Sequence, residues 1–501
     1  MARHSCAFPA CLRLAMGGLA GSQEDRNCGQ LQRDTVMAWA WKLLERARRL
    51  VGIALRLLGA RSPYAWREPR KTASGPRGDA GRCVLITGGH GYRNVGDEAQ
   101  LGTSIARWRE LWPSSTIRVF SPDPDYTTKE HGVECEWAPR VLWFDANRSP
   151  AYGGSSRAFE NEFRRVKRRM VWTARCLRAG IRLQFCTPAE SRLLDLIQQA
   201  DVLHASGGGY LTGMTRSRLW GSMLLLRLCH MLGTPVILTG QTIGVFRDRR
   251  DRRLAAWGMA SAKYIGLRDP CESEREIAGI GLSGPHVQSG YDDALFCERA
   301  SQEAVARVLR ASCGELGTGS YLAAVFHFWG MDEATRLQAT SRFAEMCDFA
   351  SVKAGLPVVL VPMVPWDEKA ARGVREQMSQ PAFLVDHGYD YRIARGVFAG
   401  ARAVLTMKHH PIIFAHGEGV PCLSVALDSY YLRKNRGAMA HFGQEALALD
   451  AAGFLGDGLW GVLGRFLEEL PQVAEALREA RAGAEPRSAR VLADAVAFLT
   501  G

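Results

Sequence analysis

The chain has 501 residues, of which 47% are hydrophobic and 23% charged, and its formal net charge is +13. This length predicts two domains, and the composition is typical of a globular protein rather than of a disordered or membrane-embedded one. No run of 18 or more apolar residues occurs, so a membrane-spanning helix is not expected. The thirteen cysteines form no CxxC pair, which argues against a disulfide framework or a zinc ribbon and favours a reducing, cytoplasmic compartment.

The positive charge is concentrated in two segments. Residues 1–80 contain 14 Lys and Arg against 6 Asp and Glu, and residues 155–182 contain 9 against 2. Such local basicity predicts either solvated helix faces or docking on an anionic partner, for which a membrane surface and a polyphosphate are the candidates. Nucleic acid is not expected, because no recognisable nucleic-acid module accompanies the charge.

Residues 1–80 are predicted to form an N-terminal extension. Within it, apolar residues recur at helical spacing over residues 36–60 with basic residues between them, which predicts an amphipathic helix. A helix of this kind can lie in a membrane interface or pack on the body of the protein, and both alternatives stay open. Residues 61–80 are rich in Pro, Gly, Arg and Ser and predict a linker.

Strand patterns alternate with helical patterns along the rest of the chain. The first group of strands is expected within residues 83–89, 116–121, 200–209, 235–241, 262–269 and 286–296. A helix and connector follow at 298–320, and a second group of strands is expected within 321–329, 357–365, 382–388, 403–410 and 420–428. This alternation predicts two α/β domains with parallel sheets, 81–300 and 318–501, with trailing helices at 441–501 that cover the second. The ligand is then expected between the domains, beyond the carboxyl ends of the strands.

Three loops of the first domain follow predicted strands and carry glycines or polar groups. The loop before the first helix holds Asn94, Gly96 and Asp97; its backbone could bind an anion or sugar hydroxyls, or its acids could simply favour the helix start. The run Gly207, Gly208 and Gly209 permits close approach of a ligand or makes a tight turn. Gln241 ends the fourth predicted strand and offers an amide there.

Two further strand ends carry cations. Arg268 follows an apolar strand, and its planar guanidinium suits a carboxylate or phosphate, with a structural salt bridge as the alternative. Lys408, His409 and His410 stand at the end of the strand AVLTM, where a histidine can exchange protons near neutral pH. A metal site is not expected, because adjacent residues on an extended chain point in opposite directions and no other cluster has ligand spacing.

Taken in order, these segments resemble the polysaccharide pyruvyl transferase family. The matching segments are GYRNVGDEAQL (91–101), SGGGYL (206–211), GQTIGVF (240–246), LRDPCES (267–273), YDDALF (291–296) and TMKHHPIIFAHGEGVP (406–421). The order and spacing cover about residues 83–435. The resemblance implies a GT-B-like fold of two Rossmann-like domains with a cleft between them.

The resemblance also implies transfer of pyruvate from phosphoenolpyruvate to a sugar as a ketal, without a cofactor or metal. The family's histidine falls on His410, the expected catalytic acid, and its arginine on Arg268, expected in catalysis and in donor binding. Lys408 and His409 stand where the family has arginine and leucine. Lysine keeps the charge without the bidentate fork, so Lys408 is also expected to bind the donor. The glycine loops and Asp97 would face the sugar.

Acceptors of this family in exopolysaccharide and cell-envelope pathways are often sugars on a lipid diphosphate at the inner face of the membrane. The basic segments are therefore expected to place the protein there peripherally, by attraction to anionic headgroups. Two other functions remain open: a GT-B glycosyltransferase with a nucleotide-sugar donor, and a non-catalytic scaffold in polysaccharide assembly, for which the departures at Lys408 and His409 leave room.

Overall fold

The structure, a computed structural model, describes residues 81–144, 156–180, 186–269, 271–314, 320–328 and 330–499. The amphipathic helix predicted at 36–60 and the linker at 61–80 lie outside the described residues. Residues 71–501 form one unit, and both sheets described below belong to it. None of the described helices combines the length and the apolarity that crossing a bilayer requires.

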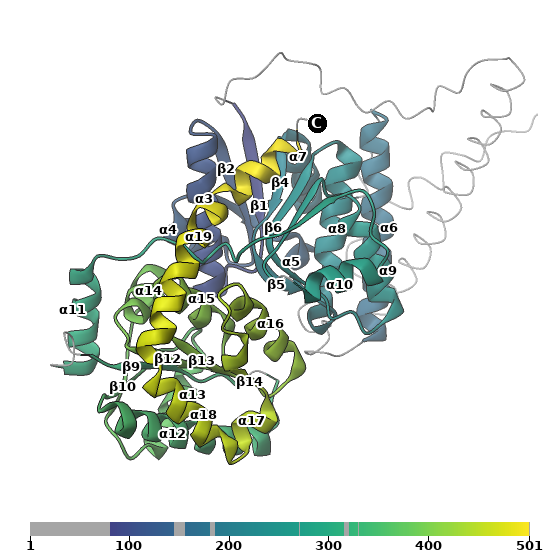
Figure 1. Cartoon of the computed structure of the whole chain (residues 1–501). Helices are drawn as coiled ribbons and strands as arrows, with labels where there is room; N and C mark the ends of the chain where they lie inside the picture. Colours follow the sequence, from purple (N-terminus) through teal and green to yellow (C-terminus); the bar gives the residue numbers. More distant parts are fainter. Residues whose placement is uncertain are drawn as a thin grey trace, which may run out of the picture. The chain divides into compact units, whose positions relative to one another are not determined.

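The first sheet is entirely parallel and has the strand order β3-β2-β1-β4-β6-β7-β8, with β5 paired to β6 (Figure 1). Its strands are β1 Cys83–Thr87, β2 Thr116–Ser121, β3 Glu134–Trp137, β4 Val202–Ala205, β5 Gly208–Leu211, β6 Val236–Ile243, β7 Tyr264–Leu267 and β8 His286–Ser289. Its helices are α3 Val95–Leu111, α4 Pro124–His131, α5 Pro139–Trp143, α6 Arg157–Arg178, α7 Pro188–Gln199, α8 Arg216–Leu232, α9 Arg249–Met259 and α10 Glu272–Gly279.

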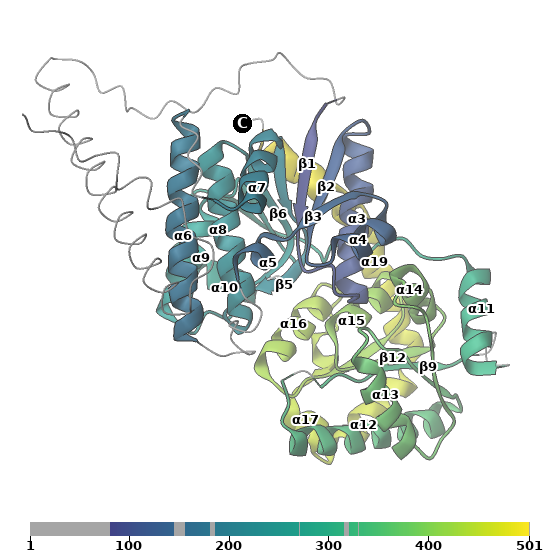
Figure 2. The ribbon, with the colours of Figure 1, turned by 180° about the vertical axis from the view of Figure 1, so that it is seen from behind.

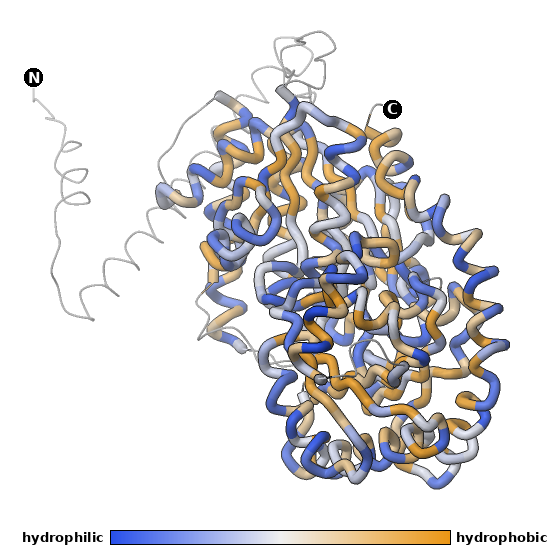
Figure 3. The backbone as a smooth tube through the Cα atoms, turned by 90° about the vertical axis from the view of Figure 1, so that its left-hand side faces the viewer, coloured by the Kyte–Doolittle hydropathy of each residue, from blue (hydrophilic) through white to orange (hydrophobic). Residues whose placement is uncertain are grey.

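Helices cover both faces of this sheet because its central strands are apolar on both sides. Successive residues of β1 point to opposite faces: Leu85 packs in the core beneath α6 and α8, whereas Val84 and Ile86 pack beneath α3. The backbone coloured by hydropathy shows the apolar strands inside and the polar helix faces outside (Figure 3).

The second sheet is also parallel, with the order β11-β10-β9-β12-β13-β14. Figure 2 shows the neighbouring strands β9 and β12 from behind. Its strands are β9 Leu322–Val325, β10 Val358–Leu360, β11 Ala382–Leu384, β12 Ala403–Thr406, β13 Cys422–Val425 and β14 Ala448–Leu449. Its helices are α12 Glu333–Ala354, α13 Asp367–Gln377, α14 Tyr391–Ala399, α15 His409–Gly417, α16 Ser429–Ala440, α17 Ala451–Leu455 and α18 Gly458–Glu468, and α11 Gln302–Cys313 precedes it.

The carboxyl ends of the two sheets face each other. Asp292, which follows β8, contacts His409, which follows β12, with 3.2 Å between the carboxylate Oδ2 and the ring Nε2. The backbone N–H of Val95 at the start of α3 donates to the carbonyl of Met363 in the second domain, at 3.0 Å. The predicted fold class, two Rossmann-like domains in a GT-B-like arrangement, is therefore confirmed.

The last helix, α19 Leu470–Ala497, belongs to both domains. Its first half places Leu477 in a core of the second domain, and its second half packs against α3, β6 and β7 of the first, where Leu492 and Ala495 join the core (Figure 1). The sequence placed all trailing helices on the second domain, but α19 is long enough to continue onto the first, where its apolar residues recur at helical spacing.

Each predicted strand segment contains a strand, and the helix expected at 298–320 is α11. Three strands were missed. β5 begins within the predicted segment 200–209, at the glycines read as a loop, and β3 and β14 are both sheet edges. In β3 (ECEW) charged residues alternate with others and two of its four side chains are exposed, a composition that suits an edge and lacks the apolar run used to recognise the interior strands. β14 has only two residues.

Candidate active site

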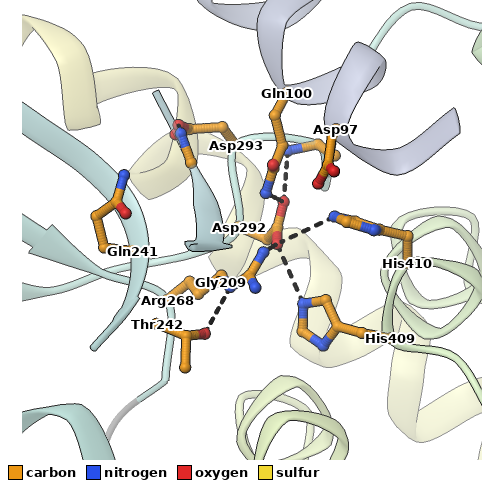
Figure 4. A network of polar contacts seen from close by, with 12 residues as sticks. Asp97, Gln100, Gly209, Gln241, Thr242, Arg268, Asp292, Asp293, His409 and His410 are labelled. Carbon is orange, nitrogen blue, oxygen red and sulfur yellow. Dashed lines mark hydrogen bonds and ion pairs between the residues drawn. The ribbon is translucent and has the colours of Figure 1, made fainter. Parts of the chain in front are cut away.

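Four side chains from both domains converge between the carboxyl ends of the sheets (Figure 4). Arg268 follows β7 and Asp292 follows β8, whereas His409 and His410 are the first two residues of α15, after β12. All four are buried. The sequence placed the histidines between the strand AVLTM and a helix that begins after His410. In the structure β12 ends at Thr406 and the helix begins slightly earlier, at His409, so both rings lie in its first turn.

Asp292 is the centre of this cluster. Its Oδ1 accepts hydrogen bonds from Gln100 Nε2 and from the backbone N–H of Ala294, both at 2.9 Å. Its Oδ2 lies 2.5 Å from Arg268 Nη1 and 3.2 Å from His409 Nε2. Burial alone would raise the pKa of the Asp292 carboxyl, but the guanidinium of Arg268 and the hydrogen bond to His409 outweigh burial and hold that pKa well below its usual value.

Both histidines are neutral at physiological pH in this arrangement. Burial lowers the pKa of His409 and of His410 to about 3, and the neighbouring positive charge of Arg268 adds to the effect. The Nε2 of His410 lies 4.0 Å from Oδ2 of Asp292 and has no hydrogen-bond partner among the described residues. The ring expected to act as the acid thus presents a nitrogen that a ligand could contact.

His409 does more than occupy the position of a family leucine, because it makes the closer contact with Asp292 (Figure 4). Asp292, His409 and His410 bring three possible metal-ligand atoms within 4.8 Å of one another. The sequence argued against a metal because adjacent side chains on an extended chain point in opposite directions. That argument does not apply, because the two histidines lie in a helical turn. The guanidinium of Arg268 already holds the Asp292 oxygen that a metal would need, so the cluster is best described as a buried ion pair flanked by two imidazoles.

Lys408 is paired with a carboxylate. Its Nζ donates to Asp367 Oδ2 at 2.8 Å, and the other oxygen of Asp367 lies 3.0 Å from His327 Nδ1. His327 Nε2 in turn lies 3.1 Å from the hydroxyl of Tyr431. The positive charge that the sequence assigns to donor binding is thus balanced by Asp367, and both side chains of the pair are largely buried.

Lys434 on α16 is a cation that the sequence reasoning missed. A Cβ built on Gly209 would lie 3.1 Å from Lys434 Nζ and 3.2 Å from Arg268 Nη2, so both cations border the same point. Within the described part of the chain, Nη2 of Arg268 has no hydrogen-bond partner and Lys434 has no ion-pair partner. Burial, with Arg268 next in effect, lowers the pKa of Lys434 to about 7. The sequence carries a signal for this residue, because the basic segment YYLRKNR comes shortly after the predicted strand VPCLSVALD.

The first loop delivers Asp97 and Gly96 to this centre. Asn94 Nδ2 donates to Asp97 Oδ2 at 2.7 Å, and the Asp97 carboxylate raises the pKa of His410 and of Lys434 against the effect of burial. A Cβ on Gly96 would fall 1.9 Å from the His410 ring. Gly96 is therefore needed for space, and Asn94 orients the acid.

The other predicted loop residues shape the backbone around the centre. Gly207 donates its N–H to Asp293 Oδ2 at 2.9 Å, and Gly208 has φ +155°. Gln241 Nε2 donates to the carbonyl of Ser206 at 2.7 Å, and Figure 4 shows its side chain apart from the histidines. Of the three glycines, Gly209 is the one that borders the cations, whereas Gln241 holds the loop that carries it.

Comparison with known protein families decides the family. The family described as polysaccharide pyruvyl transferase matches residues 94–429. The chain belongs to this family. In this pyruvyl transferase family member, the matched region runs from the start of α3 to the start of α16 and contains Asp97, Arg268, Asp292 and both histidines of α15, whereas Lys434 lies beyond its end.

A search of curated proteins finds no match for this pyruvyl transferase family member. Among solved structures, Anabaena HepE in complex with UDP-glucose is 13% identical and matches 83% of this chain and 97% of that one, with a TM-score of 0.47. UDP-GlcNAc 2-epimerase from Neisseria meningitidis is 10% identical (83% and 99%, TM-score 0.48), and a glycosyltransferase from Rickettsia africae is 9% identical (83% and 99%, TM-score 0.48). Likeness of this degree does not transfer a donor or an acceptor between proteins.

Proposed function

We propose that this protein transfers pyruvate from phosphoenolpyruvate to two hydroxyls of a sugar, in a polysaccharide or its lipid-linked precursor, and forms a pyruvate ketal. Family membership supports a pyruvyl transferase. The single observation that supports this donor is the pair of cations, Arg268 and Lys434, whose unpaired donors border one point beside Gly209. Phosphoenolpyruvate carries a carboxylate and a phosphate, the two groups that a guanidinium and an ammonium bind.

The chemistry balances without a further reactant. One sugar hydroxyl attacks C2 of the donor, its proton is lost, and a proton is added to the C3 methylene, which becomes a methyl group. The second hydroxyl then replaces the phosphate at C2, the C–O bond to phosphate breaks, and the second hydroxyl's proton leaves with inorganic phosphate. The products are the cyclic ketal and phosphate.

His410 and Lys434 are the proposed proton carriers. His410 is neutral before the donor binds, because its pKa is about 3; the negative charge of a bound phosphate favours the imidazolium and raises that pKa toward the range in which histidine acts as an acid. Lys434, with a pKa of about 7, is partly protonated at neutral pH and is the alternative acid. Asp97 would face the acceptor hydroxyls.

The test is to incubate the protein with phosphoenolpyruvate and a panel of glycosides and to measure phosphate release and the mass of the product. Arg268→Gln should abolish release, whereas Arg253→Gln, at an exposed position on α9, should leave it intact. Release of a nucleoside diphosphate from a nucleotide sugar, with none of phosphate, would favour the glycosyltransferase. Absence of both activities in a protein whose deletion alters the cellular polysaccharide would favour the scaffold.

We also propose that the protein contacts an anionic membrane surface. The apolar face of α6 packs against α8, which leaves its basic face outward. The exposed arginines on that face are Arg157, Arg164, Arg165, Arg168 and Arg175. Clustered arginines favour anionic headgroups. The full chain should sediment with vesicles that contain anionic lipid, and Arg165→Gln with Arg168→Gln, or deletion of residues 1–80, should reduce this. Unchanged sedimentation in both variants would refute the proposal.

A further inference from the structure

A second pocket lies on the first domain, beside the site described above. It has about 450 Å³ of free space, which includes its open mouth. Its floor is the end of β1 at Thr87 and Gly88, and its walls include Tyr92 and Tyr210. The pocket therefore opens at the same carboxyl edge of the first sheet from which the loop carrying Asp97 departs.

Two arginines face this pocket without acidic partners. The Cζ atom of Arg218 on α8 lies 4.7 Å, and that of Arg140 on α5 5.7 Å, from the centroid of the Tyr92 ring. Neither guanidinium has an ion pair or a side-chain hydrogen bond within the described ranges. Arg216, two residues before Arg218, is by contrast paired with Asp251 and Asp248.

The charges of the two arginines are unfavourable as they stand. Burial, followed by repulsion from Arg218, lowers the pKa of Arg140 to about 10. Burial also lowers the pKa of Arg218, although the Asp97 carboxylate opposes the shift. Two partly buried cations that repel each other around one ring lose free energy unless an anion joins them.

Arg218 also links this pocket to the central site. The groups that act on its charge are Asp97 of the first domain and Tyr430 of α16, and Asp97 acts in turn on His410. An anion held by Arg140 and Arg218 is therefore on the first-domain side of the reacting centre. The donor's negative groups are already accounted for by Arg268 and Lys434, on the other side of Gly209.

We propose that Arg140 and Arg218 bind a phosphate or diphosphate group of the acceptor, with the adjoining sugar extending past Tyr92 toward Asp97. The identification of the bound anion as part of the acceptor rests on the proposed function. The binding of an anion by the two arginines does not depend on the reaction. A diphosphate can come from a lipid-linked saccharide or from a nucleotide-linked one, and the arginines recognise the group that both share.

Binding of inorganic pyrophosphate to the full chain, measured by calorimetry, tests the site. Arg140→Gln and Arg218→Gln should each weaken binding about ten- to a hundredfold, the loss expected for a charge-assisted hydrogen bond, and Arg218→Lys should recover part of it. Arg253→Gln, at an exposed position on α9, should bind as the wild type does. Equal affinity in the wild type and both glutamine variants would overturn the proposal, and so would a loss confined to Lys434→Met, which would place the anion in the donor site.

Two further arms separate the sources of the diphosphate and the two proposals. Farnesyl diphosphate and UDP are each added as competitors of pyrophosphate, and the stronger competitor identifies a lipid-linked or a nucleotide-linked acceptor. Phosphoenolpyruvate binding is measured in the same variants. If phosphoenolpyruvate neither binds nor reacts while pyrophosphate binding still depends on Arg140 and Arg218, the proposed function fails and the anion site stands. If phosphate release proceeds while pyrophosphate binding ignores both arginines, the anion site alone fails.

Discussion

Gly96 is the position where one added methyl group should separate activity from stability. Its backbone is helical, in the first turn of α3, so the glycine is not required by its conformation. A Cβ there would lie 1.9 Å from Cγ and Nδ1 of the His410 ring and 2.5 Å from Cδ2. These separations are far below van der Waals contact, so in Gly96→Ala the imidazole must rotate away or the two domains must move apart.

Two effects on the free energy of unfolding oppose each other in this variant. Alanine is favoured over glycine inside a helix by about 1 kcal/mol, whereas overpacking a buried site costs about 1–3 kcal/mol. The net destabilisation should therefore be about 0–2 kcal/mol. Activity has no such compensation, because displacing a reacting group by about 1 Å can cost about a hundredfold in rate. We expect phosphate release to fall about a hundredfold while the melting temperature changes by a few degrees.

Gly461→Ala is the matched control. Gly461 lies inside α18, and a Cβ there would meet nothing closer than Arg465 Nη1 at 3.8 Å. This variant should be stabilised by about 0.5–1 kcal/mol and fully active. In the double variant Gly96→Ala with His410→Ala the ring is absent, so the added methyl group should no longer overpack the site. Full activity of Gly96→Ala, or an identical stability loss with and without the ring, would refute the reasoning.

Three further predictions concern the charges of the site. Lys408→Met should cost about 3–5 kcal/mol of stability in denaturant titrations, because it leaves the buried Asp367 carboxylate without its main partner. Adding Asp367→Asn should recover part of this loss. Additive losses in the double variant would contradict the prediction. The pKa of His410 is about 3 in the folded chain against 6.5 for the ordinary group, so the unfolded chain binds more protons between these values and stability is lost as the pH falls through that window. His410→Gln should lower this slope by up to about 1.4 kcal/mol per pH unit, and an unchanged slope would show that His410 is already protonated. As the pH rises through about 7, Lys434 loses its charge, so the affinity for phosphoenolpyruvate measured by calorimetry should fall. The affinity of Lys434→Arg should depend less on pH, because a guanidinium stays charged. The same pH dependence in both proteins would argue against contact between Lys434 and the donor.

The sequence was sufficient for the sheet interiors and for the loops that carry chemistry, because apolar runs that end in glycine or charge mark the carboxyl ends of parallel strands. It could not show which loop residues meet. Asp292 is part of the quoted motif YDDALF, yet its central position depends on Arg268, Gln100 and His409, which come from three separated segments. For Gln241 the sequence suggested too much. Its place at a strand end indicated contact with a ligand, but its amide donates to the backbone carbonyl of Ser206.

Lys434 and Arg218 were missed for a related physical reason. Both lie on helices, Lys434 in α16 and Arg218 in α8, where a single cation is normally a solvated surface residue. Periodicity cannot distinguish a helix position that faces water from one that faces another domain. Only the packing of α16 against the loop at Gly209, where the hydroxyl of Tyr430 donates to the Gly209 carbonyl at 2.8 Å, makes Lys434 part of the site.

The charge balance of the site suggests a division of labour among its cations. Arg268 is paired with Asp292, and Lys408 with Asp367, and both pairs are buried. A buried pair is neutral as a unit and fixes geometry better than it attracts a ligand. Of the described cations around the site, Lys434 on one side of Gly209 and Arg140 and Arg218 around Tyr92 have no ion-pair partner. We therefore expect the donor to bind at Lys434 and the free Nη2 of Arg268, and the acceptor's phosphate to bind at Arg140 and Arg218. The buried pairs Arg268–Asp292 and Lys408–Asp367 then hold the surrounding side chains in place.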